Sequence, residues 1–202
     1  QVRGYKVHLP LDLVLFASAN PEDYTNRGRI ITPLKDRFGS QIRTHYPLEV
    51  STEVEIAKQE ATPLEAEGVW VTVPDYMTEI VATLSHLARS SPHINQRSGV
   101  SVRFTITNHE VMVANAVRRA LRHGEREVAP RVSDLEALPA SMMGKIEIEA
   151  LEEGRDAQIA ENLVKAAVLT VFKERFTPER FRPIVDAFEE GTVVHAGEDV
   201  PA

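Results

Sequence analysis

Three polar residues stand where their side chains could bind an anion. Asn20 follows an apolar run, Arg37 lies in the segment PLKDRF, and Arg103 lies in the segment GVSVR. A neutral amide can hold a water molecule or an anionic oxygen without removing a proton, and guanidinium groups stabilise charge on a phosphoryl group, as phosphoryl transfer to water requires. Each residue also has a plain structural interpretation: an Asx turn before Pro21, a surface ion pair and an exposed helix position, respectively.

Other site chemistries find less support in the sequence. The chain has no cysteine, which excludes a disulfide scaffold, a thiolate zinc site and a cysteine nucleophile. His109 and Glu110 do not form HExxH because position 113 is valine, so no metal site is predicted. No GxxxxGK[ST] phosphate loop is present, and no Asp-Glu pair follows an apolar run.

Charge and hydropathy limit the class of protein. The chain has 202 residues, 43% of them hydrophobic, and a formal net charge of −7. Residues 51–202 carry most of the acidic excess, which argues against a nucleic-acid-binding surface there. No apolar run is long enough to span a membrane and no signal peptide opens the chain, so we expect a cytoplasmic protein without membrane contact.

The first 50 residues predict strands and loops. The segment Val7–Ala19 contains the apolar run LVLFA before Asn20-Pro21, which is typical of a buried strand ending in a turn. A polar loop follows over residues 20–33, and the segment Gln41–Tyr46 alternates like a second strand. Two strands cannot form a stable sheet alone, so we expect them to be parallel neighbours in a sheet whose other strands lie outside this chain.

From residue 51 the patterns are helical. Two capping-box spacings, Thr52 with Glu55 and Thr107 with Glu110, predict helix starts, and Gly124 predicts a helix end. Alternation over residues 145–151 favours a strand. The predicted helices cover residues 52–61, 74–91, 107–123, 133–138, 159–172 and 178–190.

The segments ANPEDYTNRGRIITPLKDRFGSQIRTHYP and GVSVR together resemble AAA+ ATPases. They are similar to the sensor-1 strand, the arginine-finger turn and the sensor-2 helix start of the magnesium chelatase ATPase subunit and of MoxR-like ATPases. The resemblance is most specific over residues 11–47 and looser after residue 125. It implies catalytic roles for Asn20 and Arg37, with Arg37 reaching the nucleotide of the adjacent subunit. It makes Arg103 a nucleotide-binding residue, and Arg97 is a weaker candidate.

The same resemblance implies the fold and the partners. We expect an α/β fragment, part of a parallel AAA+ sheet, over residues 1–62, followed by a mostly α-helical lid domain over residues 63–202. ATP and Mg²⁺ would be the cofactors, a homo-oligomeric ring of about six subunits the assembly, and an unidentified protein the client. The first residue is Gln1 and both main nucleotide motifs are absent, so we expect the C-terminal part of such an ATPase, inactive alone. The alternative is a non-catalytic acidic helical interaction module.

Overall fold

The computed structural model describes residues 12–19, 36–64, 68–149, 154–195 and 200. Contacts divide the chain into two compact units, Gln1–Thr44 and His45–Ala202, whereas the sequence predicts a domain boundary after residue 62. In the first unit the described residues 12–19 and 36–44 contain no helix and no strand, only a turn at Asp36 and Arg37.

The prediction of two neighbouring parallel strands in this region is wrong for the residues that the structure describes. Residues 12–19 and 41–46 form no strand, and Leu13 and Phe16 are 63% and 89% exposed. An apolar run becomes a buried strand only where other strands and helices cover it, and the described part of the chain supplies none here. The remainder of the first predicted strand, residues 7–11, lies outside the described residues.

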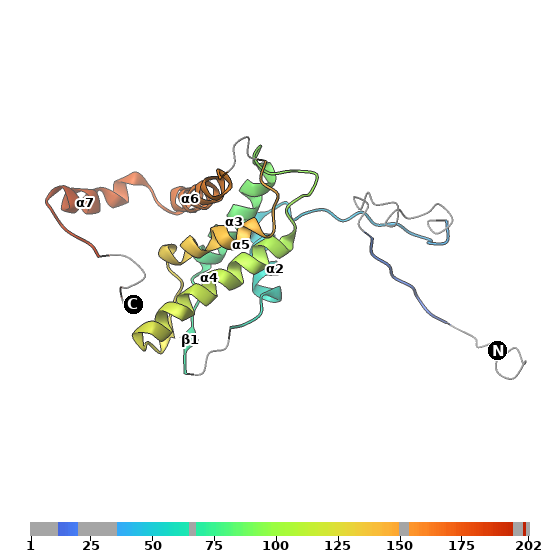
Figure 1. Cartoon of the computed structure of the whole chain (residues 1–202), viewed down its shortest axis with the longest axis horizontal. Coiled ribbons are helices and arrows are strands. Elements are labelled where there is room, and N and C mark those ends of the chain that lie inside the picture. The colour runs from blue at the N-terminus through green and yellow to red at the C-terminus, as the bar shows by residue number, and fades with distance from the viewer. Residues whose placement is uncertain (1–11, 20–35, 65–67, 150–153, 196–199, 201–202) are drawn as a thin grey trace, which may run out of the picture. The chain divides into compact units, whose positions relative to one another are not determined.

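The second unit is mostly helical, as predicted, and Figure 1 shows its elements. Helix α3 packs against α2, α4 and α6, and α5 packs against α4 and α6. The helices are α2 (Val50–Glu60), α3 (Asp75–Ser90), α4 (Val102–His123), the 3-10 helix η1 (Val132–Ala137), α5 (Leu138–Met143), α6 (Asp156–Arg175) and α7 (Pro178–Glu189).

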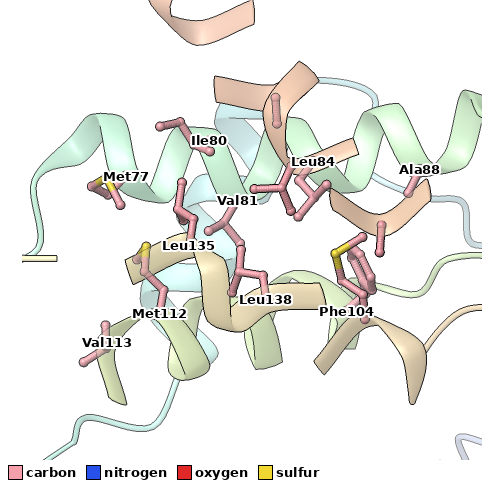
Figure 2. Close-up of a cluster of buried hydrophobic side chains, with 14 of the residues drawn as sticks. Met77, Ile80, Val81, Leu84, Ala88, Phe104, Met112, Val113, Leu135 and Leu138 are labelled. Atoms are coloured by element: carbon pink, nitrogen blue, oxygen red, sulfur yellow. The ribbon is translucent and has the colours of Figure 1, made fainter. Parts of the chain in front are cut away.

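The hydrophobic core lies between α3, α4 and the η1–α5 segment. Met77, Val81 and Leu84 recur on one face of α3 at helical spacing and are fully buried. Figure 2 draws these side chains together with Phe104 of α4 and Leu138 of α5, which belong to the same buried cluster. Helix α6 adds a stripe of small and branched residues to the same core. The second unit therefore has one continuous core.

Helix ends agree with the prediction better than helix starts do. Helix α4 ends at Gly124, which has φ 67° in the left-handed region that favours glycine. Helix α2, however, begins at Val50 rather than Thr52, and α4 begins at Val102 rather than Thr107. Residues three apart share a helix face, so the threonine–glutamate spacing also occurs inside helices, as it does in both cases here.

Extended structure is confined to short pieces in the described residues. Strands β1 (Trp70–Val71) and β2 (Glu127–Val128) pair in parallel, and neither was predicted. The predicted strand over residues 145–151 is reduced to an isolated antiparallel bridge between Ile94 and Ile148 in its described part. The short helix predicted at 133–138 nearly coincides with the 3-10 helix η1 (Val132–Ala137), which continues directly into α5. No helix within the described ranges has both the length and the hydropathy needed to cross a bilayer.

Candidate functional site

The three residues singled out by the sequence fall in different places. Asn20 lies outside the described residues. Arg37 is exposed in the turn of the first unit, and Arg103 is exposed in the second unit, at the second residue of α4. Arg37 and Arg103 belong to different units, and it is the surroundings of Arg103 in the helical unit that form a candidate site.

Arg103 occupies an electrostatically unusual position. It stands in the first turn of α4, where the unpaired N–H groups give the helix end a partial positive charge. A cation is disfavoured there by about 0.3–1 kcal/mol, whereas an anion is favoured. The Arg103 side chain makes no hydrogen bond or ion pair with any described residue. This end of α4 therefore attracts an external anion with both its backbone and its side chain.

The loop before α4 is a tight turn built on Asn95. The Asn95 side-chain oxygen accepts hydrogen bonds from the backbone N–H groups of Arg97 (2.9 Å) and Ser98 (3.3 Å). Gly99 has φ 70°, and a Cβ at this position would collide with the hydroxyl group of Tyr46. The exposed side chain of Arg97 thus projects from a fixed turn six residues before Arg103.

A buried acidic residue lies behind this end of α4. The Glu53 carboxylate on α2 is fully buried and accepts hydrogen bonds from both terminal nitrogens of Arg89 on α3, at 2.6 and 2.7 Å. The Thr105 hydroxyl on α4 donates a further hydrogen bond to it. His86 Nε2 lies 2.9 Å from Glu53 Oε2, without the alignment of a hydrogen bond. We call Glu53, His86, Arg89 and Thr105 the Glu53 cluster.

The Glu53 cluster fixes the start of α4. Arg89 Nε donates a hydrogen bond of 3.0 Å to the carbonyl oxygen of Val100, two residues before the helix begins. The Arg89 guanidinium also lies 4.6 Å from the centre of the Tyr46 ring, a cation–π contact. One arginine therefore ties α2, α3, Tyr46 and the entry to α4 together, which positions the backbone that carries Arg103.

The Glu53 cluster was missed in the sequence because its members are far apart along the chain. A usable signal existed: Glu53 and Ala57 lie one turn apart on the buried face of α2, and an acid on a buried face requires a partner. Which of the many arginines supplies that partner follows only from tertiary packing.

A second buried ion pair holds the other half of α4. Arg119 Nη2 lies 3.0 Å from Asp134 Oδ2, and Asp134 also accepts hydrogen bonds from the Asn115 side chain and the Arg131 backbone N–H. Both oxygens of the Asp134 carboxylate accept hydrogen bonds from groups within the chain. We therefore assign this pair a structural role.

The described residues offer no metal centre. Among them no group of three or more histidine, aspartate or glutamate side chains is arranged to hold a metal ion.

Comparison of the chain with protein-family models, with curated proteins and with solved structures finds no match. The site is therefore interpreted from its own geometry.

We expect His109 to make the stability of the helical unit depend on pH. It lies buried in α4, its Nδ1 has no hydrogen-bond partner among the described residues, and burial lowers its pKa below the ordinary value. The unfolded chain therefore binds a proton at a pH where the folded chain does not. The contribution of neutral His109 to the free energy of unfolding is fully present above the unfolded pKa of about 6.5. This contribution is lost as pH falls through the lower folded pKa. Urea unfolding should show a smaller free energy of unfolding at pH 5 than at pH 7.5.

A His109→Leu variant should lose part of this pH dependence, because it removes the titrating group. A His93→Gln variant is the matched control, since His93 is exposed and its replacement should leave the pH dependence unchanged. An identical pH dependence in His109→Leu and the wild type would contradict the assignment.

Proposed function

We propose that the chain is the C-terminal part of a AAA+ ATPase that resembles the magnesium chelatase ATPase subunit and MoxR-like motors. In this proposal a ring of subunits couples ATP hydrolysis to the remodelling of a partner protein. The order and spacing of the segments around Asn20, Arg37 and Arg103 support it. The first unit would belong to the nucleotide-binding core, and the helical unit would be the lid.

The observation that carries the proposal is the setting of Arg103. A cation in the first turn of a helix, without an internal partner and with a rigid support behind it, is suited to an external anion. Structural arginines in the same unit look different: Arg89 is largely buried, Arg119 is buried, and both bind carboxylates of the protein. Arg103 is held in place yet exposed, as a phosphate contact would require.

The roles follow from the residue types. When bound, ATP with Mg²⁺ supplies the phosphoryl group that is transferred to water. Arg103 would neutralise oxygens of the terminal phosphate within its own subunit, Arg37 would do so from the neighbouring subunit, and Asn20 would hold the attacking water. The described residues fit the phosphate better than the metal, because they present exposed cations but no carboxylate cluster. We therefore assign Mg²⁺ binding to other parts of the ATPase.

Substitution of Arg103 tests the proposal. In the complete ATPase, Arg103→Ala should lower ATP turnover about 100-fold, the order of loss seen when one charge-stabilising group is removed. Arg103→Lys should keep part of the activity, because it preserves the charge but not the forked geometry. Arg126→Ala is the matched control, an exposed arginine just after the other end of α4, and should have a much smaller effect. Unchanged turnover in Arg103→Ala would contradict the proposal.

A non-catalytic interaction module is the second candidate function. It is favoured by α7, which buries none of its residues although one face is apolar. The two candidates are distinguished by the same turnover measurement, because an interaction module has no ATP hydrolysis that Arg103 could affect.

A further inference from the structure

Helix α7 presents an apolar face without a partner in the described chain. Phe181, Ile184, Val185 and Phe188 follow the i, i+3, i+4, i+7 spacing of one helix face. Ile184, Val185 and Phe188 are each about half exposed, at 50%, 51% and 52%. Only Phe181 has a packing role, in a cluster with Phe172 and Phe176 that joins α6 to α7.

A short helix with an apolar face is stable only when that face packs against another surface. Helix α7 has 12 residues and contains Pro183 in its interior, which removes a backbone hydrogen bond. Isolated helices shorter than about 12–15 residues are marginal in water even without a proline, so helical stability comes from packing of the apolar face. The three exposed side chains are those that such packing would bury.

A complementary surface lies on α4 of the same unit. An open, mainly apolar groove of about 560 Å³ is lined by Leu64, Ala114, Val117, Arg118, Leu121 and Arg122. Leu121 is 59% exposed and Leu64 is 43% exposed, so the walls are hydrophobic and accessible. Arg118 and Arg122 are exposed one helical turn apart on its rim. The rim is thus basic, although the chain as a whole is acidic.

We propose that α7 of one copy of this chain docks in the α4 groove of a second copy. The charges are complementary: the C-terminal half of α7 carries Asp186 and Glu189, Glu190 follows directly after it, and the groove carries two arginines. Glu189 lies one turn after Val185, so it flanks the apolar face and can reach the rim when that face enters the groove. An amphipathic helix in an apolar groove is a recurrent recognition mode.

The contact is head-to-tail, because it joins two different surfaces. A pair joined in this way keeps one free α7 and one free groove, so the association continues from copy to copy and closes into a ring or extends as a filament. The inference uses only residues of the helical unit and does not depend on the proposed ATPase activity.

Cysteine cross-linking tests the contact directly, since the chain contains no cysteine of its own. Leu121→Cys and Val185→Cys are made in separate chains, mixed and oxidised. One of the two chains carries a tag that gives it a different mass, so the mixed disulfide is distinguished from disulfides between identical chains. We expect the mixed disulfide to dominate, and to be minor when Glu161→Cys, at an exposed position of α6, replaces Val185→Cys. A first mixture in which the mixed disulfide does not dominate would overturn the proposal. So would a chain carrying both cysteines that forms only an internal disulfide, because α7 would then fill its own groove.

Charge reversal tests the complementarity. Arg122→Glu and Glu189→Arg should each reduce association in sedimentation velocity, and the two changes combined in one chain should restore it. Glu161→Arg is the control and should associate like the wild type. A wild-type chain that stays monomeric at high concentration would overturn the proposal, as would single reversals without effect, since another partner would then have to cover α7.

Discussion

In the proposed ATPase, replacing Arg37 by alanine should lower ATP turnover by about 10³-fold or more and leave ATP binding nearly unchanged. A finger arginine stabilises the charge that spreads over the transferred phosphoryl group, which is larger in the transition state than in the ground state. Such a loss corresponds to about 4 kcal/mol or more. A surface ion pair, the structural alternative for an exposed arginine in a turn, contributes only about 0–1 kcal/mol. The two interpretations therefore differ by orders of magnitude in rate.

Mixed rings show whether Arg37 acts across a subunit boundary. Subunits with Arg37→Ala are combined with subunits that are disabled in the phosphate loop, which the remaining part of the proposed ATPase would supply. ATP turnover is then measured while ring assembly is monitored. Some interfaces then join an intact finger to an intact nucleotide site, so partial recovery is expected. Arg43→Ala is the control, an exposed arginine of the same unit. If Arg37→Ala turns over ATP normally, or if mixed rings form without recovery, Arg37 is a surface residue.

The helical part of the fold was accessible from sequence because its signals are local. The periodic apolar residues of α3 and the glycine that ends α4 act within a few turns of the chain. The strands depended on partners instead. The same apolar run, Leu13–Ala17, that is typical of a buried strand is exposed here, since burial is decided by what packs on it rather than by its own residues. The two-residue pair β1–β2 is too short to produce a pattern.

The candidate site, like the fold, could be predicted only in part from the sequence. Arg103 was singled out from a short segment, and the structure places it in the first turn of α4. Its support could not be found in this manner. Glu53 and Arg89 are 36 residues apart and come together only because α2 packs against α3. Motifs indicate which side chains meet a ligand, whereas the groups that position them are determined by tertiary packing.

Breaking the Glu53 cluster should be the largest single change to the stability of the helical unit. An Arg89→Met variant leaves the fully buried Glu53 carboxylate without its main partner, and removal of one member of a buried ion pair costs about 3–5 kcal/mol. Glu53→Met should cost a similar amount, because it leaves the Arg89 guanidinium, whose side chain is only 12% exposed, without its carboxylate. Urea unfolding at pH 7 measures both losses.

The double variant separates the ion pair from simple packing. Glu53→Met with Arg89→Met removes both charges together, so its loss of stability should be smaller than the sum of the two single losses. It should still be less stable than the wild type by about 1–3 kcal/mol, because the Val100 carbonyl loses its hydrogen bond from Arg89. Asp75→Asn, which weakens the exposed Lys58–Asp75 pair between the same two helices, is the control and should cost far less. Additive single losses would show that Glu53 and Arg89 act independently, and the entry to α4 would then have to be held by packing alone.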